Sequence, residues 1–454
     1  MLGRSSQMTQ ETVNVGRLID DRPMGRLQVL TIALCALVNM LDGVDTQSIG
    51  VAAPFIAETM GVPITSFGPV FSAALLGAAL GAIGFGALAD RLGRKRLLVV
   101  ALFLMSAFTL LTAHAPDFTW LLVYRFLAGL GLGGATPCFI ALTSEYAPAR
   151  HRSACVTLMW SGFPLGAMIG ALANSALLES HGWRAIFYLG GVLPLVLAAV
   201  VIVWLPESLK FLVTRGLDGA ARRVIARIGV GLGPNTALAT DERPAGAPLR
   251  QVFAQGRALA TFVLWVPFFT SMGILTVAVL WTPSLLRLNG ISPAATAFVV
   301  AFNGLGAFVG QAVCGRLIER VGTVPALMPA FVLGALVTAG LGYGASSVPA
   351  AATFIGLNGL FLGFASAGAI ALAARLYPTP VRSSGVGLGM AMGRFGQMVG
   401  PLVAGWMLSS GFTAGQIMLA IGSTAMIGAA FVVWFHFLMT REKADAGAAQ
   451  VRIG

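Results

Sequence analysis

Residues Leu27–Val51 read LQVLTIALCALVNMLDGVDTQSIGV, an apolar run of 25 residues that carries two acidic side chains. About 20 consecutive apolar residues are enough for a helix to cross a bilayer. Asp42 and Asp45 stand three positions apart and therefore share one face of that helix. A carboxylate at mid-membrane depth costs about 2.5–3.5 kcal/mol on insertion scales, so the pair needs polar partners or water. The stretch therefore predicts a membrane helix that faces a polar space inside a helix bundle.

Apolar runs of this length recur along the whole chain of 454 residues. The sequence is 57% hydrophobic and 10% charged, whereas a soluble protein carries about 25% charged residues. We therefore predict an all-α membrane protein with twelve transmembrane helices in two bundles of six. The predicted spans are Leu27–Val51, Phe67–Leu88, Leu97–Ala113, Trp120–Leu142, Ser153–Leu177, Ala185–Leu205, Leu259–Leu280, Ala294–Leu317, Pro325–Gly342, Ala350–Ala374, Gly385–Ser409 and Ala414–Phe437.

The basic residues are distributed unevenly between the two sides of these spans. Of 29 Lys and Arg, 25 fall in loops on one side, whereas only Arg184 and Arg287 fall on the other. The positive-inside rule makes the basic side cytoplasmic and places both termini there. The net charge of +12 therefore reflects membrane topology, and we expect the lipid bilayer rather than nucleic acid as a partner. Residues 1–26 lead into a full-length span without a cleavable signal peptide.

Two halves of the sequence resemble each other. Gly86-x-x-x-Asp90-Arg91-x-Gly93 recurs as Gly315-x-x-x-Glu319-Arg320-x-Gly322 at an offset of 229, and Gly166 with Gly170 recurs as Gly396 with Gly400 at 230. Parallel repeats of this kind place a substrate site between them near the membrane midplane. The predicted organisation is a cytoplasmic tail (1–26), a first bundle (27–205), a cytoplasmic linker (206–258), a second bundle (259–437) and a second tail (438–454).

Three motifs carry a family resemblance that covers essentially the whole chain. Gly86–Arg96 reads GALADRLGRKR and closely matches the loop between spans two and three of the major facilitator superfamily. The motif Asp42-Gly43-Val44-Asp45 and the segment RFLAGLGLGG (Arg125–Gly134) resemble its aromatic acid:proton symporter family, bacterial importers of benzoate-type and hydroxybenzoate-type carboxylates. The resemblance implies the major facilitator fold and proton-coupled import of an aromatic carboxylate by alternating access across the bacterial inner membrane. We expect a monomer that uses protons as its coupling ion and needs no cofactor.

Asp42, Asp45 and Arg125 are the candidates for proton coupling. Asp42 lies about 15 residues, or roughly 22 Å, from the inner end of span one. Two buried carboxylates repel each other, so such a pair can take up and release a proton. Arg125 in span four lies at a similar depth and could pair with either aspartate or with a substrate carboxylate, and arginine here is typical of the proton-coupled members. The alternatives are a permanent structural ion pair, and an arginine that reaches the outer interface.

Arg394 is the main candidate for substrate binding. It lies near the middle of span eleven, and no acidic residue stands inside a predicted span of the second half. An anionic substrate could supply the missing charge through the two-pronged guanidinium group. An ion pair with an aspartate of span one, or a packing role, remains an alternative. Arg125 is a second carboxylate ligand in this prediction, and Trp160, Phe302 and Asn303 are candidates for contacts with an aromatic ring and its hydroxyl groups.

A conformational gate is predicted at the inner ends of the spans. Asp90, Arg91 and Arg94 end span two and open span three, and Glu145 and Arg152 lie at the next loop on the same side. Opposite charges there can lock the inner face in one state and separate in the other, as the superfamily's loop motif is understood to do. The glycines of that motif, Gly86 and Gly93, belong to the same candidate gate. The alternative is that these charges only set the topology.

Other function classes fit the sequence less well. Another organic acid, a sugar or a drug exchanged for protons remains an alternative substrate, although buried arginines disfavour sugars and cationic drugs. A nucleotide-binding loop is absent from the sequence, which argues against an ATP-driven pump. We also find no catalytic pair, and the four cysteines lack the spacing of a metal site or a disulfide framework. The prediction is therefore a transporter with no catalytic residues and no metal, not an enzyme.

Overall fold

The structure is a computed structural model that describes residues 12–233, 236–240, 250–254, 256–288, 290–345, 347–378 and 381–451. The spans of the first half are α2 (Arg26–Met60), α3 (Phe67–Leu92), α4 (Arg94–Thr112), α5 (Phe118–Tyr146), α6 (Arg152–Trp160) continued by α7 (Gly162–His181), and α8 (Trp183–Trp204). Those of the second half are α12 (Ala258–Leu288), α13 (Pro293–Val321), α14 (Thr323–Gly344), α15 (Val348–Leu376), α16 (Arg382–Ser409) and α17 (Ala414–Val451).

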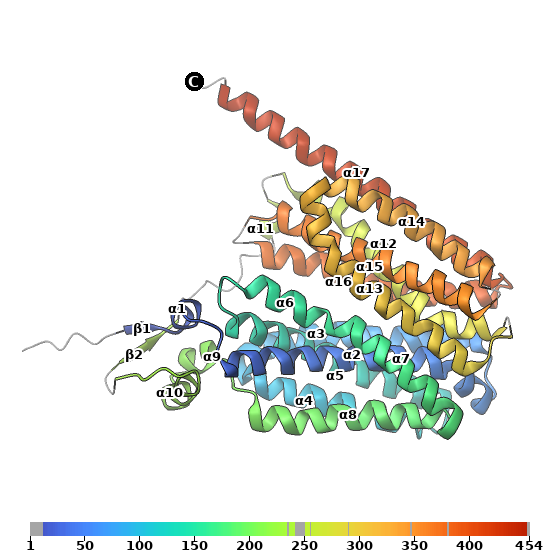
Figure 1. Ribbon diagram of the computed structural model, residues 1–454, viewed down its shortest axis with the longest axis horizontal. Helices are drawn as coiled ribbons and strands as arrows, with labels where there is room; N and C mark the ends of the chain where they lie inside the picture. The colour runs from blue at the N-terminus through green and yellow to red at the C-terminus, as the bar shows by residue number, and fades with distance from the viewer. Residues whose placement is uncertain are drawn as a thin grey trace, which may run out of the picture.

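The helices form two bundles that lie one above the other in Figure 1, with α2–α8 below and α12–α17 above. Eleven helical segments of the described chain are long and apolar enough to cross a membrane. The remaining span is α16, which has 28 residues and includes Arg394. The predicted all-α fold with two six-span bundles is therefore confirmed. Span five is divided at Ser161 into α6 and α7.

The sequence repeat is also a repeat in helix packing. A Cβ atom at Gly77 of α3 would lie 2.0 Å from the carbonyl oxygen of Phe126 in α5. A Cβ atom at Gly306 of α13 would likewise lie 2.0 Å from the carbonyl oxygen of Gly356 in α15. These pairs are related by offsets of 229 and 230, so glycine permits the same close crossing in both halves.

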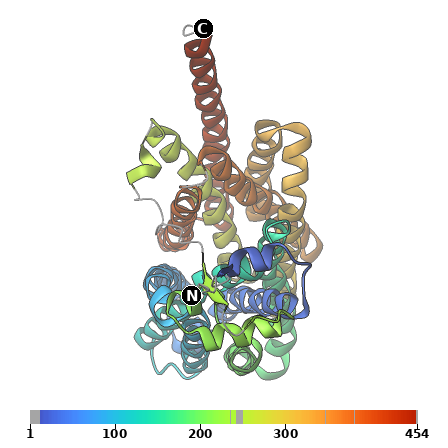
Figure 2. The same cartoon turned by 90° about the vertical axis from the view of Figure 1, so that its left-hand side faces the viewer.

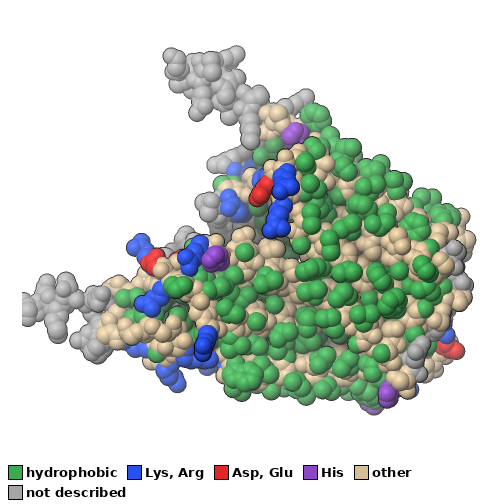
Figure 3. All heavy atoms as spheres, in the orientation of Figure 1, with side chains coloured by type: hydrophobic (Ala, Val, Ile, Leu, Met, Phe, Trp, Pro, Cys, Tyr) green, Lys and Arg blue, Asp and Glu red, His purple; other side chains and the backbone are tan. Residues whose placement is uncertain are grey.

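The two halves meet at the end opposite the linker, here called the far side. Trp281 of α12 packs edge-on against Phe71 of α3, with ring centroids 5.5 Å apart. The Ser72 hydroxyl of α3 donates a hydrogen bond of 2.7 Å to the Met398 carbonyl oxygen of α16. Toward the linker the helices of the two halves diverge, and Figure 3 shows the surface hollowed between them. The halves are therefore closed on the far side and open on the linker side.

The N-terminal segment and the linker fold together against the first half. Strand β1 (Thr12–Asn14) pairs in parallel with β2 (Ala237–Ala239). Helix α1 (Val15–Asp20) lies beside α9 (Leu209–Thr214), and α9 in turn contacts α10 (Asp218–Arg227). A short helix α11 (Arg250–Phe253) leads into α12. Figure 2 looks onto this end of the molecule. Val15, Ile19 and Ile225 are buried there in one apolar cluster with the first bundle.

The sides of the bundles present a broad apolar surface, as Figure 3 shows in green. Ile83, Leu158 and Trp406 are among its members, with 72%, 66% and 65% of each residue exposed. Lys and Arg gather instead at the left of that view, on the linker side. A soluble monomer rarely exposes so much contiguous apolar surface, so a lipid environment accounts for it.

Candidate functional site

Asp45 and Arg125 form an ion pair buried inside the first half. Nη2 of Arg125 on α5 lies 2.7 Å from Oδ2 of Asp45 on α2, and Nη1 donates to Oδ1 at 3.1 Å. Thr109 of α4 donates to the same Oδ1 at 3.1 Å, and the Phe187 ring of α8 lies 6.0 Å from the guanidinium carbon. Only 2% of Asp45 and 1% of Arg125 are exposed, so this arginine does not extend to the membrane interface. The two-pronged contact connects α2 with α5, and the hydrogen bond from Thr109 connects α4 to the same carboxylate.

Asp42 points in a different direction, toward the second half. It is only half-buried and accepts a hydrogen bond of 3.3 Å from the hydroxyl of Thr46. Arg394 of α16 is also half-buried, and the opposite charges of Asp42 and Arg394 attract each other. In the part of the chain that the structure describes, however, no ion pair within 4.0 Å joins them. The structure therefore places one acid of the motif inside the first half and the other at the interface between halves.

Gly43 sets the position of the acidic motif. A Cβ atom at this residue would lie 2.1 Å from the Phe163 carbonyl oxygen and 2.7 Å from the Ala167 nitrogen, both on α7. Any larger residue would therefore push α2 and α7 apart. Gly43 therefore allows α2 to cross α7 closely at the position of the acidic motif.

Arg394 contacts the first half directly. Its Nη2 donates a hydrogen bond of 3.4 Å to Oγ1 of Thr136 on α5. Arg394 stands 230 residues after Pro164 of α7, at the offset of the repeat. The second half thus carries a cation where the first half carries proline.

The three candidates for ring contacts lie apart from one another. Trp160 ends α6 and packs edge-on against Phe139 at 6.0 Å within the first half. Phe302 packs against Phe298 at 5.4 Å, and 43% of Phe298 is exposed. Asn303 is 3% exposed, and its amide nitrogen donates to the Ile355 carbonyl oxygen and to Oδ1 of Asn358, both at 3.2 Å. The structure brings neither Phe302 nor Asn303 into a described contact with Asp42 or Arg394.

Several predicted gate residues form one polar network at the linker side of the first half. Arg94 forms ion pairs with Glu145 and, at 3.1 Å, with Asp90, and it donates to Oγ of Ser208 at 2.7 Å. Glu207 accepts hydrogen bonds of 2.9 Å from the backbone nitrogens of Lys95 and Ser208. The network therefore connects α3, α4 and α5 to the start of the linker. All of these described contacts lie within the first half and the start of the linker.

Gly93 makes this network possible. Its φ of +101° is unfavourable for other residues, and a Cβ atom there would lie 2.5 Å from Oε2 of Glu207. Gly86 is less constrained, because a Cβ atom at that position would lie 3.6 Å from the Cβ atom of Pro137, an ordinary contact distance.

Arg91 and Arg152 have other partners. The Arg91 carbonyl oxygen accepts a hydrogen bond of 2.8 Å from Arg215 of the linker. The Arg152 guanidinium lies 2.9 Å from Oδ1 of Asp20 in α1. Arg152 is thus paired with the N-terminal segment rather than with Glu145.

The sequence interpretation did not assign roles to Thr46, Thr109, Thr136, Glu207 or Ser208. The threonines are single polar residues in long apolar helices, and sequence alone does not show which of them face a charge. The run Leu205-Pro206-Glu207-Ser208 was a usable signal, because an acidic residue directly after a membrane span suggests a partner nearby.

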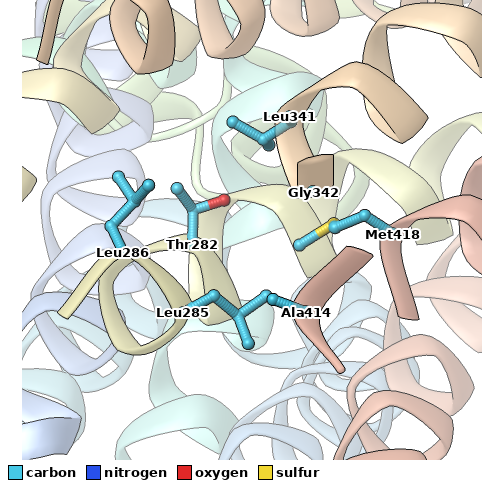
Figure 4. A pocket seen from close by; sticks show the side chains of 7 residues that line it. All are labelled: Thr282, Leu285, Leu286, Leu341, Gly342, Ala414 and Met418. Atoms are coloured by element: carbon cyan, nitrogen blue, oxygen red, sulfur yellow. The ribbon is translucent and has the colours of Figure 1, made fainter. Parts of the chain in front are cut away.

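One pocket within the second half is too small for an organic substrate. Figure 4 shows this pocket, which is lined by Thr282, Leu285, Leu286, Leu341, Gly342, Ala414 and Met418. Its volume of about 10 Å³ holds at most one water molecule. The described residues contain no cluster of three or more potential metal ligands, and the four cysteines are buried free thiols. Asp42 and Arg394, between the diverging halves, are therefore the best candidate for a binding site.

Two helical bundles related by a repeat, an apolar outer surface and opposite charges on the two bundles are typical of a membrane transport protein. The family profile described as Major Facilitator Superfamily matches residues 35–342 and 268–452. The chain belongs to the major facilitator superfamily.

Curated relatives cover nearly the whole chain. It is 33% identical over 432 residues to the 4-hydroxybenzoate transporter PcaK of Pseudomonas putida, covering 92% of this chain and 95% of the relative. It is 33% identical to the gallate transporter of Pseudomonas putida, over 92% and 94% of the two chains. It is 35% identical to the 3-(3-hydroxy-phenyl)propionate transporter of Escherichia coli, over 86% and 90%. These relatives are transporters, and the chain is accordingly a transporter and not an enzyme.

Proposed function

We propose that this protein imports an aromatic carboxylate together with at least one proton, by alternating access. The observation that carries the proposal is the placement of Asp42 and Arg394 on opposite halves, at the interface that must open and close. The named substrates of the relatives, 4-hydroxybenzoate, gallate and 3-(3-hydroxyphenyl)propionate, all combine an aromatic ring with a carboxylate.

In this proposal the substrate carboxylate binds the guanidinium of Arg394. A charge-assisted hydrogen bond contributes about 1.5–3 kcal/mol, and a carboxylate can accept two from one arginine. The protonated form of Asp42 would not compete for that guanidinium, whereas the ionised form would. Proton binding at Asp42 therefore favours substrate binding at Arg394. The proton gradient is linked to the substrate gradient because the affinity for the substrate differs between the protonated and the ionised protein.

Asp45 and Arg125 have a supporting role in this mechanism. Because they neutralise each other inside the first half, they hold α2 in the position from which Asp42 faces the second half. The gate residues Asp90, Arg94 and Glu145, joined within one half, would keep that half rigid while the halves move against each other. We further propose that the linker side is cytoplasmic, that the protein resides in a bacterial inner membrane as a monomer, and that bundles 27–205 and 259–437 are its two moving bodies.

Uptake by the purified protein in liposomes tests this function. With an imposed pH gradient, acid outside, labelled 4-hydroxybenzoate should accumulate, and a proton ionophore should abolish the accumulation. Glucose, a non-aromatic acid such as succinate and a cationic dye serve as competitors for the other substrate classes. Accumulation that ignores the pH gradient, or that only a non-aromatic competitor inhibits, contradicts the proposal.

A further inference from the structure

Asp42 and Arg394, the two charged residues between the halves, each form a hydrogen bond with a threonine. Thr46 of α2 donates to Oδ1 of Asp42 at 3.3 Å, and Thr136 of α5 accepts from Nη2 of Arg394 at 3.4 Å. Thr136 is 6% exposed, so its hydroxyl has little water to bind in place of the arginine. The Thr136 contact also crosses from the first half to the second.

This arrangement needs an explanation, because Asp42 and Arg394 attract each other. Opposite charges on neighbouring helices can form a direct ion pair. Yet no ion pair within 4.0 Å joins Asp42 and Arg394 among the described residues, and the guanidinium turns to Thr136. The hydroxyl of Thr136 on α5 therefore competes with the Asp42 carboxylate on α2 for the same guanidinium.

We propose that Thr136 is a positioning residue that holds Arg394 away from Asp42, so that the guanidinium stays available to the substrate carboxylate. The inference rests on the proposed function, since it assigns a role within the same site. Without the hydroxyl, ionised Asp42 competes more strongly for the guanidinium, and the substrate must more often break an Asp42–Arg394 ion pair. The apparent affinity for the acid then falls in proportion to the fraction of protein with a free guanidinium.

Calorimetric titration of the purified full-length protein with 4-hydroxybenzoate tests this role. Thr136→Val removes the hydroxyl at nearly constant volume and should weaken binding by about threefold to tenfold, the range for one hydrogen bond. Thr136→Ser keeps the hydroxyl and should stay within about twofold of the unmodified protein. Thr136→Ala serves in place of valine if the valine variant does not fold.

Thr282→Val is the matched control. Thr282 is 1% exposed, and its hydroxyl has no hydrogen-bond partner among the described residues (Figure 4). This second threonine-to-valine change in a buried membrane helix should leave binding of the acid unchanged.

A double-mutant comparison separates positioning from general packing. In an Asp42→Asn background Arg394 has no carboxylate to close on, so adding Thr136→Val should change the affinity by less than about twofold. Unchanged binding in Thr136→Val alone, or an equal loss with and without Asp42, overturns the inference. If the unmodified protein binds no aromatic acid, the proposed function fails first, and this outcome is distinct from a failure of the role of Thr136.

Discussion

Replacing Asp45 by asparagine leaves Arg125 buried without its counter-charge. The two contacts at 2.7 and 3.1 Å use both carboxylate oxygens, and asparagine keeps only one acceptor oxygen and no negative charge. Only 1% of the arginine is exposed, so water has little access to replace the lost contact. Removing one partner of a buried pair costs about 3–5 kcal/mol, because an uncompensated charge remains inside. Asp45→Asn should therefore lower the free energy of unfolding by about that amount.

Asp42→Asn is the matched control, since the same chemical change is made three residues away. Asp42 is half-buried and makes one hydrogen bond of 3.3 Å, so we expect a loss of about 1 kcal/mol or less. Denaturant unfolding of the purified variants in detergent measures both values. Combining Asp45→Asn with Arg125→Gln should cost less than the sum of the single changes, because neither charge remains unpaired. Equal losses for the two asparagine variants would refute the division of roles between the aspartates.

Three further predictions concern proton coupling at Asp42, helix packing at Gly43 and the far-side contact between the halves. Asp42→Asn should still bind 4-hydroxybenzoate but lose accumulation driven by a pH gradient in liposomes, and retained accumulation would count against proton coupling at this residue. Gly43→Ala should sharply reduce the yield of folded protein in size-exclusion chromatography, because the added Cβ atom would lie 2.1 Å from a backbone oxygen of α7. The control Gly84→Ala should leave the yield unchanged, because no atom lies within 4 Å of its added carbon. Glu58→Gln removes the far-side ion pair of 2.7 Å with Arg287, which contributes under about 1 kcal/mol to stability because the Glu58 side chain is largely exposed. The loss should nevertheless increase thiol labelling of a Ser72→Cys reporter at the contact between the halves. Unaltered labelling would argue against the view that this ion pair keeps the far side closed.

The membrane spans and the repeat could be predicted from the sequence because both are one-dimensional patterns. Long apolar runs give the spans, and a constant offset of 229 or 230 gives the two halves. Even α16, with Arg394 and many glycines, is long enough to be predicted as a span, and its Gly396 and Gly400 match Gly166 and Gly170 of the first half. The same patterns led to the superfamily, which the family comparison confirms.

The division between Asp42 and Asp45 could not be predicted from the sequence. Three positions along a helix turn a side chain by only about 60°, so both acids lie on one broad face. Which of them meets Arg125 depends on where α5 crosses α2, and that crossing is set by tertiary packing. The pairing of β1 with β2 was hidden for a similar reason, because two three-residue strands far apart in sequence carry no detectable pattern.

The polar network at the linker side shows both the reach and the limit of motif reasoning. The motif pointed to Asp90 and Arg94, which form an ion pair on the linker side, but their neighbours Glu207 and Ser208 come from the other end of the first half. Arg152 pairs with Asp20 in α1, a segment whose fold the sequence did not suggest. Charged residues in loops have many possible partners, and only the folded backbone selects among them.

We propose, above all, that the guanidinium of Arg394 binds the carboxylate of the substrate. Calorimetric titration of purified protein with 4-hydroxybenzoate and with 4-hydroxybenzamide, on the unmodified chain and on Arg394→Gln, tests it most directly. We predict that Arg394→Gln binds the acid about tenfold to a hundredfold more weakly, as expected for lost charge-assisted hydrogen bonds, and that binding of the amide is unaffected. Equal affinity of the two proteins for the acid would contradict the account.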